Sequence, residues 1–86
     1  MALHTDDIVL DKNDGWTEIP LLNNGTFVQI IEIKDDIAIR ARIGSDSNSV
    51  GITMKNKDQL KAPQSIYAKT YSKFKTTVIV IRDGDE

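Results

Sequence analysis

Hydrophobic and polar residues alternate along several short stretches of the chain, which is the pattern of β-strands with one buried face. The clearest stretch is residues 37–43, where isoleucine and alanine fill every second position and Arg40 and Arg42 lie between them. Residues 77–81 are instead β-branched throughout, as in a central strand that is covered on both faces. Further stretches bring the prediction to seven short strands: residues 7–10, 16–19, 26–33, 50–54 and 65–71.

Turn-forming residues separate these stretches at short intervals. Asn-Asp-Gly at 13–15 and Asn-Asn-Gly at 23–25 tolerate positive φ, as tight turns demand. Residues 44–49 are a loop by composition, and residues 56–61, with one large apolar side chain, are predicted to form a turn rather than a helix. The pattern predicts an all-β fold: a small, single-domain antiparallel β-sandwich or barrel of about seven strands.

Domain boundaries and core residues follow from the same pattern. We expect an N-terminal arm and first short strand at residues 1–13, the β-sandwich domain at 14–82 and an acidic tail at 83–86. The side chains expected in the core are Trp16, Ile19, Phe27, Ile31, Ile37, Ile39, Ile43, Ile52, Tyr67, Val78 and Val80.

The composition agrees with this fold and excludes several classes of protein. Isoleucine, valine and threonine make up 24 of the 86 residues, and these stiff side chains favour strands. The absence of cysteine excludes disulfides, thiolate metal sites and cysteine nucleophiles. No stretch approaches the roughly 18 apolar residues of a transmembrane helix, and no secretion signal is expected. Because so short a chain buries a small core, we expect a partner surface or self-association to support it.

Charge is divided unevenly along the chain. Residues 1–36 hold eight acidic and two basic residues, whereas residues 37–82 hold nine basic and two acidic residues. Such a division can steer association, but it cancels where strands from the two halves pair, and we expect cancellation.

Candidate chemistry is sparse. The only histidine, His4, is expected to be solvated near the terminus, and residues 11–15 are typical of an ordinary turn rather than a calcium loop. The chain has no glycine-rich phosphate loop and no nucleophile with an orienting base. We therefore predict no catalytic residue, no cofactor, no metal and no enzymatic activity.

Two binding functions stay open as alternatives. In a small nucleic-acid-binding β-barrel, Lys69, Lys73, Lys75, Tyr67 and Tyr71 would line a groove, although the isoelectric point near 5.3 argues against it. In a carbohydrate- or receptor-binding module, Trp16 or the tyrosines would be exposed.

Six short motifs follow one another along the chain: Asp-Gly-Trp-Thr-Glu-Ile at 14–19, Phe-Val-Gln-Ile at 27–30, Arg-Ile-Gly-Ser-Asp at 42–46, Gly-Ile-Thr-Met at 51–54, Ile-Tyr-Ala-Lys at 66–69 and Thr-Val-Ile-Val at 77–80. Their order resembles that of small all-β virion proteins of tailed bacteriophages, of the capsid-decoration or head–tail accessory type. On this resemblance, the carbohydrate- or receptor-binding alternative would be a module at the tail. The resemblance covers residues 14–82 and implies a non-enzymatic structural protein in the virion, assembled in the host cytoplasm.

The resemblance further implies binding to other virion proteins of the capsid or tail, in symmetric copies or as a homo-oligomer, with no membrane partner. We expect the partner contacts at the exposed face of Arg40 and Arg42. A second expected contact is the acidic arm of residues 1–7, with Asp6 and Asp7, which would become ordered on a neighbouring subunit.

Overall fold

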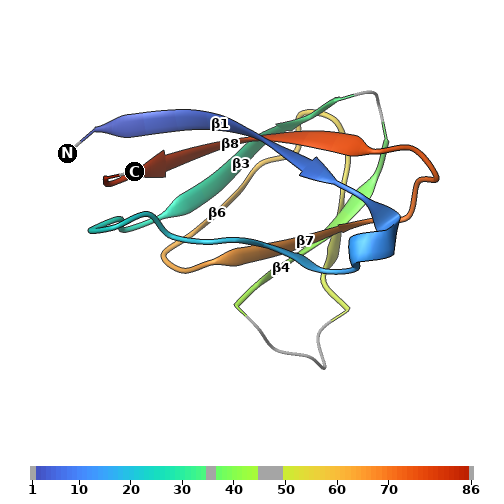
Figure 1. Cartoon of the computed structure of the whole chain (residues 1–86), viewed down its shortest axis with the longest axis horizontal. Coiled ribbons are helices and arrows are strands. Elements are labelled where there is room, and N and C mark those ends of the chain that lie inside the picture. The colour runs from blue at the N-terminus through green and yellow to red at the C-terminus, as the bar shows by residue number, and fades with distance from the viewer. Residues whose placement is uncertain (1, 35–36, 45–49, 86) are drawn as a thin grey trace.

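The chain folds into two antiparallel β-sheets packed face to face, as a computed structural model shows for residues 2–34, 37–44 and 50–85 (Figure 1). The described strands are β1 (Leu3–Leu10), β2 (Thr17–Ile19), β3 (Val28–Ile33), β4 (Ile39–Ile43), β5 (Ile52–Met54), β6 (Leu60–Ala62), β7 (Ile66–Thr70) and β8 (Thr76–Asp83), with a 3₁₀-helix, η1 (Lys12–Asp14), between β1 and β2. The prediction of an all-β antiparallel sandwich is confirmed. In the part of the chain described, no helix has the length and apolar character that crossing a membrane requires.

Each sheet has four strands. The first has the order β1-β8-β3-β6 and the second has the order β2-β7-β4-β5. Strands of the two halves of the sequence therefore alternate in the first sheet, whereas three of the four strands in the second sheet come from residues 37–82. Both chain ends lie at the same end of the first sheet, where β1 and β8 run side by side (Figure 1).

The N-terminal segment is a strand of the sandwich rather than an arm, which corrects the prediction for residues 1–7. β1 runs from Leu3 to Leu10 and pairs with β8 along its whole length, with Leu3 opposite Asp83. The hydrophobic alternation does not predict this strand at residues 3–6, because Asp6 places a polar side chain at an inward position. That carboxylate is tolerated because it accepts a hydrogen bond from Nη2 of Arg82 at 2.8 Å.

The predicted acidic tail also begins too early. Asp83 is the last residue of β8 and is buried, and its carboxylate accepts hydrogen bonds from the backbone N–H groups of Thr26 and Phe27 at 2.7 and 3.0 Å. The Thr26 hydroxyl donates a third. These bonds, chiefly that of the Thr26 side chain, hold the pKa of Asp83 below its ordinary 3.8, although burial opposes them.

An eighth strand, β6, replaces the end of the predicted turn at residues 56–61 and continues to Ala62. It has three residues and pairs with β3 at the edge of the first sheet, with Leu60 opposite Ile30. So short an edge strand carries no periodic signal, and its pairing with β3 is a tertiary effect that local sequence does not encode.

The core lies between the sheets and is built from alternate residues of each strand. The buried apolar side chains are Leu10, Ile19, Val28, Ile30, Ile33, Ile39, Ala41, Met54, Ala62, Ile66, Ala68, Val78 and Val80. Four predicted core residues are confirmed: Ile19, Ile39, Val78 and Val80.

Seven predicted core residues are not buried in the core. Ile43 and Ile52 are exposed by 41% and 54%, because Ile52 lies in the edge strand β5 and Ile43 lies at the end of β4, beyond the residues that pair with β5. The other five are half-buried: Trp16, Phe27, Ile31, Ile37 and Tyr67. Strand β8 is central in its sheet, but the protein core lies against only one of its faces. Val78 and Val80 are buried on that face, whereas Ile79 and Ile81 alternate with them and are half-buried on the outer face.

Candidate functional site

Aromatic and cationic side chains alternate across the outer face of the second sheet. Nζ of Lys69 is 5.3 Å from the ring centroid of Tyr71 and 5.8 Å from that of Trp16. Cζ of Arg42 is 4.3 Å from the ring centroid of Trp16 and 5.6 Å from that of Tyr67. We call these five side chains the cation–aromatic ladder; each of its two cations contacts two rings.

Strand register brings the ladder together. β7 lies between β2 and β4, so Tyr67 is opposite Glu18 on one side and opposite Arg42 on the other. Lys69 is opposite Arg40 in the next outward-facing row. Because the even-numbered residues of β7 are buried in the core, the odd-numbered residues point outward. The sheet therefore presents side chains from distant parts of the sequence as one surface.

Gly51 makes room for the indole of Trp16. Its φ is +75°, and a Cβ there would lie 2.6 Å from the carbonyl oxygen of Ala41 and 3.1 Å from Cη2 of Trp16. Any other residue at this position would push against both the backbone of β4 and the tryptophan. The glycine thus allows the ladder's central ring to rest close to the sheet.

Positive charge is concentrated on this face. Arg40, Arg42 and Lys69 supply three cations, and the register places one carboxylate, that of Glu18, in the same row as Arg42. Among the residues that the structure describes, neither Arg40 nor Lys69 forms an ion pair. Since a cation–π contact does not neutralise the cation, the face keeps a positive potential toward solvent.

Glu18 fixes the end of the ladder. The Tyr67 hydroxyl donates a hydrogen bond to Oε2 of Glu18 at 3.0 Å. This bond raises the pKa of Tyr67 above its ordinary 10.0, because only the protonated phenol can donate the hydrogen bond. Desolvation and the negative charge of Glu18 also raise the pKa, whereas the positive charge of Arg42 lowers it. Tyr67 is therefore a neutral, oriented ring at neutral pH.

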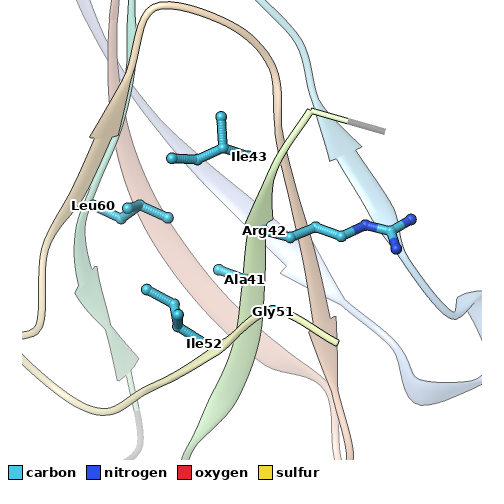
Figure 2. Close-up of a pocket in the computed structure, with 6 residues that line it drawn as sticks. All are labelled: Ala41, Arg42, Ile43, Gly51, Ile52 and Leu60. Carbon is cyan, nitrogen blue, oxygen red and sulfur yellow. The ribbon is translucent and has the colours of Figure 1, made fainter. Parts of the chain in front are cut away.

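An apolar pocket opens at the edge of the same sheet, on the other side of β4 (Figure 2). Its volume is about 180 Å³, below the roughly 300–1,000 Å³ of typical small-molecule sites. In Figure 2 the side chains of Ile43, Ile52 and Leu60 point into the space between β4 and β6, whereas that of Arg42 points to the opposite side. The pocket is lined by Ala41, Arg42, Ile43, Gly51, Ile52 and Leu60.

The predicted site residues separate into distinct places. Arg40 and Arg42 lie on the ladder face, as the alternation in β4 predicts. Asp6 and Asp7 lie instead in β1 of the other sheet, where Asp6 pairs with Arg82 at 2.8 Å and Asp7 with Lys34 at 3.8 Å.

The five residues of the nucleic-acid alternative also divide. Tyr67, Lys69 and Tyr71 belong to the ladder, and Tyr71 is 62% exposed. Lys73 and Lys75 lie in the exposed connection between β7 and β8, outside the ladder, and Nζ of Lys73 is 5.3 Å from the ring centroid of Phe74.

The remaining sequence candidates have structural roles. Asp11 caps η1 by accepting a hydrogen bond from the N–H of Asn13 at 2.9 Å, which confirms the turn prediction. His4 is half-buried rather than solvated, with Nε2 2.9 Å from the carbonyl oxygen of Gly84. Across residues 2–34, 37–44 and 50–85, no group of three or more acidic or histidine side chains could hold a metal ion.

Comparisons of the chain with protein-family models, with curated proteins and with solved structures gave no match.

Proposed function

We propose that this protein is a non-enzymatic structural component of a tailed-phage virion that binds a neighbouring virion protein. The proposal is supported by the resemblance of residues 14–82 to small all-β phage proteins and by the shape of the β5 edge. It assigns the chain to a capsid-decoration or head–tail accessory role, present in symmetric copies.

The single observation that carries the proposal is an apolar pocket beside an open strand edge. β5 pairs with β4 on one side, and no strand in the described part of the chain pairs with its other side. Ile43 and Ile52, exposed by 41% and 54%, place apolar surface at this edge. A partner strand can add to such an edge and insert one side chain into the pocket beside it.

The pocket's size and chemistry favour a protein partner. A pocket of about 180 Å³ lined by isoleucine and leucine accepts an apolar side chain better than a drug-sized molecule. Burial of large apolar side chains at roughly 25 cal/mol per Å² gives a docked partner a substantial gain in free energy.

Quantitative mass spectrometry of purified virions from the phage that encodes this chain tests the proposal. Copies near the number of capsid subunits would define a decoration protein, and a few to about a dozen copies would place it at the neck or tail, where ring symmetry sets the number. Absence of the chain from clean particles would refute the proposal.

A pair of variants tests the β5 edge itself. Ile52→Lys places a charge at the apolar pocket, so we expect its copy number per virion to fall sharply. Thr53→Lys adds the same charge to the next residue of β5, which is also exposed but alternates to the other face, and its copy number should stay near that of the wild type. Equal incorporation of both variants would show that the pocket is not the docking site.

A further inference from the structure

We propose that the cation–aromatic ladder binds single-stranded nucleic acid, with the cations at phosphates and the rings against unpaired bases. This inference goes beyond the proposed structural role in the virion, because the ladder and the β5 pocket lie on opposite sides of β4 (Figure 2).

The geometry supplies both parts that sequence-tolerant binding to single strands requires. Proteins of this kind combine a basic track for the backbone with aromatic side chains on which successive bases stack. Here the two kinds of group alternate from Tyr71 to Tyr67, with each cation–ring distance between 4.3 and 5.8 Å. Tyr71, at one end, is 62% exposed and offers ring surface directly to a base.

Strand pairing fixes the backbone of the ladder before any ligand binds. Tyr67 and Lys69 are held by β7 between two neighbouring strands, Arg40 and Arg42 by β4, and the Tyr67 hydroxyl by Glu18. Side chains already in place lose little conformational entropy on binding.

Local charge outweighs the net charge of −2. At physiological ionic strength, charges more than about 8 Å apart are largely screened. Packed sheets lie about 10 Å apart, and acidic residues such as Asp7 are exposed on the opposite sheet. A strand lying on the ladder therefore interacts mainly with three cations, Arg40, Arg42 and Lys69, and with one carboxylate, that of Glu18. The local balance is positive, so an isoelectric point near 5.3 does not exclude binding.

The chain contains a matched control on the opposite sheet. Nζ of Lys61 is 4.3 Å from the ring centroid of Phe27, which forms an isolated cation–π pair between β6 and the start of β3. Lys61→Glu and Lys69→Glu each remove one cation over a ring and lower the net charge from −2 by the same amount. Only Lys69→Glu changes the ladder.

The experiment titrates the purified full chain with oligo(dT) of about 16 nucleotides, the upper end of site sizes for one small β-barrel. Trp16, the only tryptophan, reports binding through its fluorescence because it is the central ring of the ladder. Two phosphate contacts, at Arg40 and Lys69, predict that affinity falls roughly sevenfold between about 50 and 200 mM salt. Tyr71→Ala should weaken binding about tenfold through the loss of one stacked base.

The control variants and probes decide between this inference and its rivals. We expect Lys69→Glu to weaken binding by at least about tenfold and Lys61→Glu by less than about twofold. Equal weakening by the two variants would overturn the proposal, as would the absence of oligo(dT) binding at low salt. Polyglutamate or duplex DNA of matched charge binding as tightly as oligo(dT) would also overturn it, because stacked single-stranded bases would then contribute nothing.

Discussion

Removal of the buried hydroxyl pair at the ends of the connection that runs from β7 in one sheet to β8 in the other is predicted to give non-additive losses of stability. Oγ1 of Thr70 and Oγ1 of Thr76 lie 2.9 Å apart, and both residues are almost wholly buried. The Thr70 hydroxyl also accepts a hydrogen bond from the N–H of Ser72 at 3.2 Å. This pair anchors the connection that carries Tyr71, so it links packing in the core to the ladder.

The magnitudes follow from which polar groups each change leaves without a partner. Thr76→Val leaves the Thr70 hydroxyl bonded to Ser72 but without its hydroxyl partner, at a cost of about 1 kcal/mol. Thr70→Val leaves both the Thr76 hydroxyl and the Ser72 N–H without that partner, at a cost of about 2 kcal/mol. In the double variant no buried hydroxyl remains, so its loss should be no greater than about 2 kcal/mol rather than the sum of the two.

Urea unfolding followed by Trp16 fluorescence measures the free energy of unfolding of the wild type, the two single variants and the double variant, which together form a double-mutant cycle. Each free energy follows directly from its unfolding curve because a small single domain unfolds in one cooperative step. Because valine has nearly the shape of threonine, the cycle isolates the hydrogen bonds rather than cavity formation. A double variant whose loss equals the sum of the single losses, within error, would refute the reasoning that the two hydroxyls depend on each other.

Three further predictions concern acid sensitivity, a tyrosine pKa and a close backbone approach. Because the pKa of Asp83 is held below 3.8, its contribution to stability is complete above that value and is lost as the pH falls through the folded-state pKa. The Tm of the wild type should therefore fall steeply below about pH 4, and the Tm of Asp83→Asn should fall less over the same range. In a Tyr71→Phe background, the tyrosinate absorbance of Tyr67 should titrate with a pKa above 10.0, because the hydrogen bond to Glu18 raises that pKa. Glu18→Gln should lower the pKa, and an unchanged pKa would contradict this cause. Gly51→Ala should lower the free energy of unfolding by at least about 1–2 kcal/mol, and by more than Gly44→Ala does. Both glycines have positive φ, but only a Cβ at Gly51 would meet backbone, 2.6 Å from the Ala41 carbonyl oxygen. Urea unfolding compares the two variants, and equal losses would exclude the backbone clash.

Alternation along the chain predicts the fold class and most strands because each strand has one face in the core. Ile19, Ile39, Val78 and Val80 are buried where that pattern places them. The prediction fails where a polar residue occupies an inward position, as Asp6 does opposite Arg82. Those two residues are far apart in sequence, so the ion pair that makes β1 possible is not visible in any local window.

Two rings of the ladder, Trp16 and Tyr67, are predicted in the core for a related reason. Large aromatic residues usually contribute most of the buried area in a small protein, which favours the core for Trp16 and Tyr67. In β7, however, Ile66 and Ala68 are the inward residues, so strict alternation turns Tyr67 outward. That signal was present in the sequence, whereas the approach of Trp16 to Arg42 depends on strand order, which the sequence pattern does not specify.

Strand order also determines where the acidic and basic halves of the sequence pair, and therefore where their charges cancel. In the first sheet, β8 lies between β1 and β3, so the basic and acidic halves of the sequence meet, as in the pair Arg82–Asp6. In the second sheet only β2 comes from the acidic half, and β7, β4 and β5 come from the basic half. The expected cancellation thus occurs in one sheet and fails in the other. The topology leaves a positive outer face on a protein of net negative charge, and that is the face on which the aromatic rings also gather.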